Sequence, residues 1–336
     1  MADAERIAAL LRRAGWSDAA MRPIAGDASA RRFTRLSRDG ESAILMDASG
    51  DISGSSARFA AMSRWLIKAG LSAPAILAAD LPGELLLVED FGDAVFARVL
   101  DTAPARETEL YLAAAAFLTD LQRHAPARDL PRLLGPELGQ LTVLLLEWYI
   151  PAMGGARRAS AAQIPDLIAG LYERLADGAR LVTSLRDFHA ENVIWLPARE
   201  GPARLGLLDF QDAVATHPAY DLVSFLQDAR RDLATATEAA AIDLYCELTG
   251  RDPASFAPIY ALIGAQRALR ILGVFARLIL HAGKPRYAQF MPRVWRHLRT
   301  NLAHPALSEL AGAVLDSVPE PTPESIDALV ARCPTV

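Results

Sequence analysis

Two short apolar runs separated by a turn-rich segment constrain the fold of this chain more than any other feature. The runs occupy residues 193–196 and 205–208, and the segment between them contains Gly201 and Pro202. This pattern predicts a β-hairpin. The two ends of a hairpin lie side by side, so we expect Asn192, before the first run, to lie close to Asp209, after the second.

The polar residues at the base of this hairpin suit a hard cation. Mg²⁺ takes one or two oxygen ligands from a protein and completes its shell with phosphate and water. Asp187 precedes Asn192 by five positions, the spacing at which a phosphoryl-transfer loop offers a carboxylate to a hydroxyl and an amide to a metal. The alternative interpretation is a surface hairpin flanked by ordinary capping carboxylates. Together and in this order, the three residues favour a kinase.

The composition is that of a globular protein. The chain has 336 residues, of which 52% are hydrophobic and 22% charged, enough for two lobes or one large domain. The N-terminus has no basic-then-apolar signal pattern, and no apolar run approaches the roughly 20 residues of a membrane span. Cys246 and Cys333 are the only cysteines, which excludes a disulfide framework and fits a reducing compartment. We therefore expect a cytoplasmic protein.

The predicted elements change in type along the chain. A helix at 7–14 leads into strands at 22–25, 32–36 and 43–46, a helix at 59–67, and strands at 75–77 and 84–88. Helical patterns then occupy 107–124, 136–153, 161–176, 219–231, 234–249, 257–281, 293–302 and 324–332. The predicted fold class is α+β, a bilobal protein-kinase-like fold with a small antiparallel-sheet N-terminal lobe and a mainly helical C-terminal lobe. We expect lobes at 1–90 and 91–318, and a proline-rich linker with a short terminal helix at 319–336.

Residues 185–192 follow the pattern H-x-D-x-x-x-x-N except at its first position, and Leu208-Asp209 supply the (I/L)D pair that comes after it. On this block the chain resembles the aminoglycoside/choline phosphotransferase superfamily of small-molecule kinases. Further segments are similar to the bacterial N-acetylmuramate/N-acetylglucosamine 1-kinases, which are anomeric sugar kinases: residues 26–29, 43–48, 209–213, 217–224 and 227–231. The resemblance covers roughly residues 5 to 305.

The resemblance implies a phosphotransferase that uses ATP and Mg²⁺ and has an alcohol group as acceptor. Asp187 would accept or orient the proton of a sugar hydroxyl, and Asn192 and Asp209 would hold Mg²⁺ against the phosphates. The residues expected to bind ATP are Gly26, Asp27, Ala28, Ser29, Arg31, Arg32, Glu89 and Phe91. Gln211 and Asp212 are expected at the acceptor, whereas Asp221 and His189 are expected to be structural.

Two positions depart from the family pattern. Leu185 stands in place of the catalytic-loop histidine, and Met46 stands in place of the strand-three lysine that binds ATP phosphates in kinases. A methionine cannot neutralise a phosphate, so we expect Arg31 and Arg32 to take over that role. A nucleotide-binding regulatory pseudokinase is the competing interpretation.

Charge distribution bears on the acceptor. The formal net charge is −5, yet no Asp or Glu occurs between Phe256 and Ser308, a stretch named here the acid-free segment. Its basic residues are Arg267, Arg270, Arg277, Lys284, Arg286, Arg293, Arg296 and Arg299. A polycationic aminoglycoside needs carboxylates, and choline needs an aromatic cage, so this segment favours a neutral or anionic acceptor.

N-acetylmuramate carries a carboxylate that arginine can bind in bidentate fashion. Arg267 and Arg270, three apart on one helical face, are the candidates, against the alternative of a solvated or ion-paired face. The predicted function is therefore phosphorylation of the anomeric hydroxyl of N-acetylmuramate or N-acetylglucosamine in cell-wall recycling. The alternatives are a kinase of an aminoglycoside, a choline-like or another amino alcohol, or a pseudokinase. We expect no nucleic-acid or membrane partner, and a monomer or weak dimer.

Overall fold

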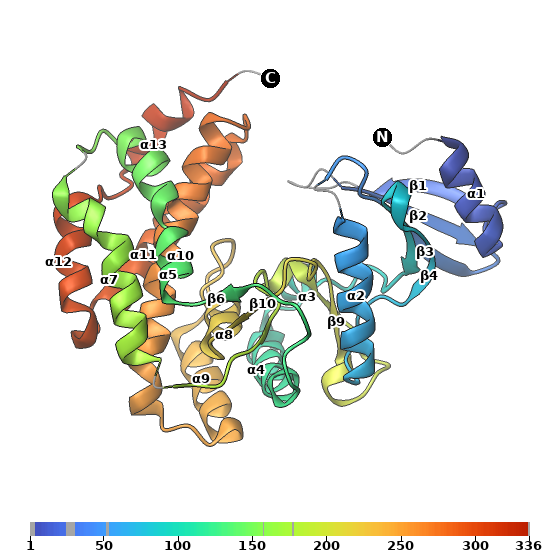
Figure 1. The fold of residues 1–336 in the computed structure, drawn as a ribbon, viewed down its shortest axis with the longest axis horizontal. Coiled ribbons are helices and arrows are strands. Elements are labelled where there is room, and N and C mark those ends of the chain that lie inside the picture. The colour runs from blue at the N-terminus through green and yellow to red at the C-terminus, as the bar shows by residue number, and fades with distance from the viewer. Residues whose placement is uncertain (1–3, 25–30, 52–53, 157, 177, 335–336) are drawn as a thin grey trace. The chain divides into compact units, whose positions relative to one another are not determined.

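The computed structural model describes residues 4–24, 31–51, 54–156, 158–176 and 178–334. The chain groups into two compact units, residues 1–128 with 185–213, and residues 129–184 with 214–336. Unit 1 holds the large sheet, and unit 2 holds most of the helices (Figure 1). The predicted α+β fold is confirmed, while the lobe boundaries at residues 91 and 319 stay a prediction.

Unit 1 contains a five-stranded antiparallel sheet with the strand order β1-β2-β3-β5-β4. Asp39 and Gly40 join β2 to β3 with φ angles of 48° and 80°, which are typical of a type I′ hairpin turn. The predicted meander and the two later strands are confirmed. The strands are β1 (Ala20–Ile24), β2 (Arg32–Arg38), β3 (Glu41–Asp47), β4 (Ile76–Asp80) and β5 (Leu85–Glu89).

The two faces of this sheet pack against different helices. Leu45 of β3 belongs to a buried cluster with Leu10 of α1 (Ala4–Ala14). Successive residues of a strand point to opposite faces, so Met46 lies on the other face, on the side of α2 (Ser55–Lys68) (Figure 1). Only 1% of Met46 is exposed, which identifies it as a core residue.

The predicted hairpin is confirmed within unit 1. Strand β8 (Val193–Trp195) pairs antiparallel with β9 (Leu205–Leu207). Backbone hydrogen bonds tie it to the rest of the unit, because Leu207 N donates to Ser72 O and Trp195 N donates to Ala94 O, each at 2.8 Å. The unit also contains α3 (Phe96–Thr102), which we did not predict, and α4 (Glu107–Arg123), which we did.

Unit 2 is built around one long helix, α10 (Pro253–Leu280). A three-stranded sheet with the order β6-β10-β7 was not predicted, because strands of two or three residues carry no readable alternation. Its strands are β6 (Arg132–Leu133), β7 (Val182–Ser184) and β10 (Val214–Thr216). The other helices are α5 (Gly135–Gln140), α6 (Ile150–Ala152), α7 (Ala159–Leu175), α8 (Ala219–Leu226), α9 (Thr235–Thr249), α11 (Met291–Leu302), α12 (Ser308–Ser317) and α13 (Pro323–Val330).

Two predicted helices were wrong in extent. The helix expected over 136–153 is broken after α5, and a π-helical turn at Leu145–Tyr149 precedes α6. Helix α10 approaches the backbone of Leu144 closely at Gly273, because a Cβ at Gly273 would lie 2.5 Å from the carbonyl carbon of Leu144. A tertiary contact therefore sets this irregular turn.

The helix expected over 219–231 ends early, at Leu226. Beyond it, the Asp228 carboxylate accepts hydrogen bonds from the backbone N of Arg230 at 3.0 Å and from its guanidinium at 3.3 Å. Such a local side-chain turn competes with helical hydrogen bonding.

Helix α10 has 28 residues, and by length and composition alone it could cross a membrane. However, 78% of its apolar window is buried inside the protein. The central helix of a globular unit can have the same length and apolar composition. Helices α7, α8 and α11 pack against α10, as expected for such a central helix.

Candidate active site

Asn192 and Asp209 lie together at the base of the hairpin, as predicted. Leu208 N donates to Asn192 O at 2.9 Å, which closes the hairpin end, and the Asn192 Nδ2 to Asp209 Oδ2 distance is 3.5 Å. Asn192 Nδ2 also donates to the backbone O of Asp187 at 2.9 Å. With Nδ2 used in this way, the amide oxygen of Asn192 is the atom left to face a cation.

The backbone on both sides of this cluster adopts a rare conformation. Arg186, next to Asp187, has φ 68°, and Asp209 has φ 57°. A non-glycine residue in this region costs of order 1–3 kcal/mol and is found most often where a site requires it. Asp209 lies two residues after the end of β9, at the same end of the hairpin as Asn192.

The Asp209 carboxylate is ionised and held by two neighbours. Arg31 Nη2 lies 2.5 Å from Oδ1, and Gln211 Nε2 donates to the same oxygen at 3.0 Å. Burial acts to raise the pKa of Asp209, but the charge of Arg31 and these hydrogen bonds outweigh it and hold the pKa below the usual range. An anionic carboxylate beside an amide oxygen is a suitable pair of ligands for Mg²⁺.

The donor set fits a metal that is shared with a nucleotide better than one held by protein alone. Among the residues that the structure describes, no group of three His, Cys, Asp or Glu could hold a metal ion. Mg²⁺ in phosphoryl-transfer sites is bound by one or two carboxylates and completed by phosphates. Asn192 and Asp209 would hold it here, and it would neutralise charge on the phosphates.

The residues expected to bind the nucleotide phosphates differ in burial and in the residues that they contact. Arg31 contacts Asp209 at the base of the hairpin, whereas Arg32 is exposed on β2. Met46, at the usual lysine position, is buried in the core of the sheet. The predicted residues Gly26, Asp27, Ala28 and Ser29 lie outside the described part of the chain.

Glu89 and Phe91, expected to bind ATP, both contact Arg199 of the hairpin loop, a residue that we did not predict. Arg199 Nη2 lies 2.6 Å from Glu89 Oε1, and the guanidinium carbon of Arg199 lies 5.0 Å from the centroid of the Phe91 ring. Arg199 Nη1 also donates to Ser72 Oγ at 2.7 Å. A lone arginine in a hairpin loop carries no sequence signal for this role.

The remaining predicted residues of unit 1 surround the same cluster. Gln211 is buried and supports Asp209, while its neighbour Asp212 is exposed. His189 lies beside Asn192, with Nε2 at 3.3 Å from Nδ2. The structural role expected for His189 and the acceptor role expected for Gln211 and Asp212 stay predictions.

Asp221 is a buried residue of unit 2 in the first turn of α8. Its Oδ1 accepts a hydrogen bond from Ser184 Oγ at 2.6 Å, at the end of β7 and directly before the catalytic loop in sequence. The structural role expected for Asp221 stays a prediction. Ser184 itself was missed, because a single serine at the end of a strand is an ordinary feature of many sequences.

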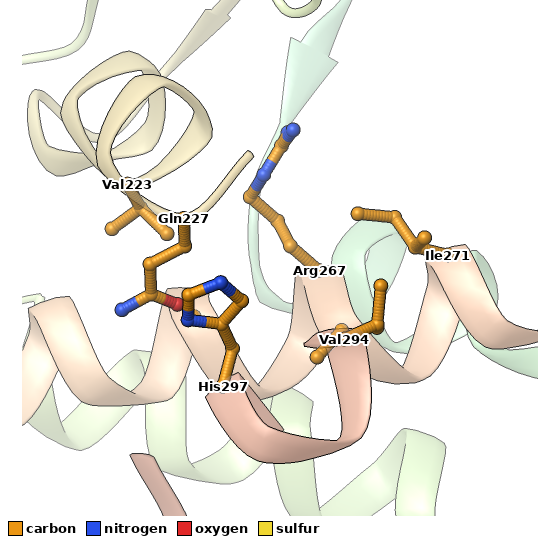
Figure 2. Close-up of a pocket in the computed structure, with 8 residues that line it drawn as sticks. Val223, Gln227, Arg267, Ile271, Val294 and His297 are labelled. Carbon is orange, nitrogen blue, oxygen red and sulfur yellow. The ribbon is translucent and has the colours of Figure 1, made fainter. Parts of the chain in front are cut away.

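Arg267 and Arg270 lie in α10 of unit 2. Arg267 is 9% exposed, donates to Ser224 Oγ at 2.6 Å, and stacks over the Tyr220 ring at 4.7 Å. It also borders a small pocket between α8, α10 and α11, and Figure 2 shows its guanidinium directed away from His297 of that pocket. The guanidinium of Arg267 therefore already has partners in α8. A role for Arg267 or Arg270 at the acceptor stays a prediction.

Comparisons with known proteins show the family of this chain. Residues 20–259 match the model of the phosphotransferase enzyme family. The N-acetylmuramate/N-acetylglucosamine kinase of Caulobacter vibrioides is 36% identical over 340 residues, covering 90% of this chain and 93% of that protein. The kinase of the same name from Pseudomonas aeruginosa is 30% identical over 322 residues, covering 91% of each.

Solved structures share the fold at low identity. A choline/ethanolamine kinase family protein from Mesorhizobium loti has a TM-score of 0.60 at 16% identity, covering 92% of this chain and 97% of that one. An aminoglycoside phosphotransferase from Streptomyces rimosus, in complex with ADP and streptomycin, has a TM-score of 0.52 at 17% identity, covering 80% and 97%. The resemblance drawn from the sequence is confirmed. The chain belongs to the phosphotransferase enzyme family.

Proposed function

We propose that this chain is a kinase that transfers the γ-phosphoryl group of ATP, with Mg²⁺, to the anomeric hydroxyl of N-acetylmuramate or N-acetylglucosamine. One observation supports the acceptor class above the others: the end-to-end similarity to kinases named for these two sugars, at up to 36% identity. A place in cell-wall recycling follows from the same acceptors.

The cluster at the hairpin base supports phosphoryl transfer. Asp187 would orient the sugar hydroxyl and accept its proton as the oxygen attacks phosphorus. Asn192 and Asp209 would hold Mg²⁺, which neutralises negative charge on the transferring group. Phosphoryl transfer depends mainly on in-line positioning and charge neutralisation, so three oxygen-bearing side chains and one arginine suffice.

The positive charge of the acid-free segment supports an anionic acceptor less strongly than its composition implies. Arg293 and Arg296 both contact Asp232, and Arg267 is bound to Ser224. Arginines with protein partners have less capacity for a ligand carboxylate. The choice between the two sugars therefore does not rest on these residues.

Met46 supports one competing function. A buried methionine in place of the phosphate-binding lysine is what a regulatory pseudokinase that binds nucleotide without turnover would contain. A kinase of another small alcohol, such as an aminoglycoside or a choline-like amino alcohol, is the other alternative, because the fold is shared with such enzymes.

An ATP-consumption assay on a panel of acceptors separates these functions. We expect turnover with N-acetylmuramate and N-acetylglucosamine, loss of turnover in Asp187→Asn, and a ³¹P NMR signal from a sugar 1-phosphate. Nucleotide binding without turnover on any acceptor would support the pseudokinase. Preference for an aminoglycoside or choline over both sugars would overturn the acceptor assignment.

We also propose a cytoplasmic location, action as a monomer or weak dimer, and no nucleic-acid or membrane partner. Light scattering on the purified protein tests the oligomeric state, and fractionation of cells tests the location.

A further inference from the structure

We propose that Arg31 is the phosphate-binding cation of this active site and that Asp51 is the residue that positions it. Together they would replace the lysine–glutamate ion pair that binds and orients ATP phosphates in protein kinases. This inference rests on the proposed function, because it concerns a nucleotide at the same catalytic cluster.

Both halves of that ion pair are missing from their usual places. In protein kinases the lysine lies on the third strand and the glutamate on the helix that follows it. Here Met46 stands on β3, and the next helix, α2 (Ser55–Lys68), contains no Asp or Glu. Loss of the lysine alone would leave an unpaired glutamate, so the joint absence indicates that the pair has moved.

The structure contains an equivalent pair one strand away. Arg31 lies directly before β2 (Arg32–Arg38), and its Nε is 3.6 Å from Asp51 Oδ2 while its Nη2 is 2.5 Å from Asp209 Oδ1. Only 10% of the Arg31 side chain is exposed. One guanidinium therefore joins a carboxylate near the start of α2 to the predicted metal ligand.

Asp51 is itself held in place. Its backbone N donates to Ala48 O at 2.9 Å, and its Oδ2 accepts from Ser55 Oγ at 2.9 Å. The start of α2 is further fixed by Glu84, whose carboxylate accepts from the backbone N of Gly54 at 2.5 Å and of Ser56 at 2.9 Å. Because Asp51 is anchored in this way, it can retain Arg31 when the other contact of Arg31 changes.

The contact with Asp209 is the one that must change. A divalent cation on Asp209 would repel the Arg31 guanidinium, whereas nucleotide phosphates would attract it. Arg31 would thus exchange the Asp209 carboxylate for phosphate oxygens when metal and nucleotide bind. Without nucleotide, Arg31 and a free metal ion compete for the same carboxylate.

This competition predicts effects of opposite sign in Arg31→Ala. Calorimetry should show that Mg²⁺-ATP binds roughly 10- to 100-fold more weakly than to wild type, because a charged hydrogen bond to phosphate is lost. Electron paramagnetic resonance with Mn²⁺ and no nucleotide should show tighter metal binding, because the competing cation is gone. Arg31→Lys should recover part of the nucleotide affinity, and Asp51→Asn should weaken it by a smaller factor.

Exposed residues of unit 1 provide matched controls. Arg64→Ala removes one positive charge from an exposed position of α2, and Asp18→Asn removes one negative charge from a side chain that is 76% exposed. Both should bind nucleotide and Mn²⁺ as wild type does.

The outcomes separate this inference from the function on which it rests. If Arg31→Ala lowers the melting temperature but binds Mg²⁺-ATP and Mn²⁺ with wild-type affinity, the pair is a static ion pair and the inference is wrong. If wild type binds nucleotide but Arg31→Ala weakens metal and nucleotide alike, the exchange is overturned. If wild type binds no nucleotide at all, the proposed function falls together with the inference.

Discussion

The base of the β8–β9 hairpin and the acid-free segment both carry charged side chains, but these side chains are arranged differently. At the hairpin base, Asn192 Nδ2 donates to the backbone O of Asp187 and lies 3.5 Å from Asp209 Oδ2, all within a short stretch of chain. In the acid-free segment, Arg267 and Arg293 are paired with residues that are 43 and 61 positions away in the chain. Charge concentrated in sequence therefore marks a site only where local geometry also brings the charged groups together.

Removal of the predicted base at the hairpin should have the largest effect. We expect Asp187→Asn to lower kcat by roughly 10²- to 10⁴-fold, the usual contribution of a general acid or base, with nucleotide affinity nearly unchanged. Steady-state kinetics and calorimetry measure the two quantities. The control is Glu191→Gln, an exposed carboxylate of the same loop, and near-normal turnover in Asp187→Asn would show that phosphoryl transfer does not use this residue.

The two regions should lose stability in different pH ranges. Burial, with the charges of Arg296 and Arg293, lowers the pKa of His297 to about 4, against about 6.5 in an unfolded chain. The unfolded state therefore takes up the proton first, and we expect the free energy of unfolding to fall by about 2–3 kcal/mol as pH drops from about 6.5 to 4. Urea titrations across this range measure the slope, and His297→Gln should flatten it.

Protonation of Asp209 should lower the stability at a lower pH than protonation of His297 does. The lowered pKa of Asp209 means that its contribution to stability is present above about pH 4, the unfolded value, and is lost as pH falls through the folded value. If the free energy of unfolding falls equally between pH 6.5 and 4 in wild type and His297→Gln, groups other than His297 cause the loss of stability in that range.

Arg267→Ala tests whether the acid-free segment serves packing or the acceptor. Its guanidinium is buried against Ser224 and Tyr220, so we expect a loss of about 2 kcal/mol in the free energy of unfolding. Chemical denaturation measures the free energy of unfolding, and the KM for the sugar tests whether Arg267 contacts the acceptor. A large rise in KM with unchanged stability would instead support contact with the acceptor.

Arg296→Ala should have the smallest effect. Its side chain is 65% exposed and shares Asp232 with Arg293, and exposed ion pairs contribute about 0.5 kcal/mol or less. Thermal unfolding at low and high salt tests this. A loss as large as that of Arg267→Ala would mean that exposed charges of this segment are as important as buried ones.

Sequence reasoning succeeded where the signal was local. The hairpin and the approach of Asn192 to Asp209 follow from two short apolar runs, the turn-rich segment between them and the antiparallel pairing. It failed at the π-helical turn that faces Gly273, where a distant residue decides the conformation. It also failed at the end of α8, where the side chain of Asp228 forms a local turn that competes with the helix. Short elements such as β6 gave no periodic pattern to read.

The sequence by itself determined the fold class, the family and the spacing of Asp187, Asn192 and Asp209, because these depend on residue order and periodicity along the chain. The tertiary structure decided which charges meet: Arg31 with Asp51 and Asp209, Arg199 with Glu89, and Arg267 with Ser224. Electrostatic and hydrogen-bond partners are chosen by distance in space, and in these pairs the chain separates the partners by 20 to 178 residues.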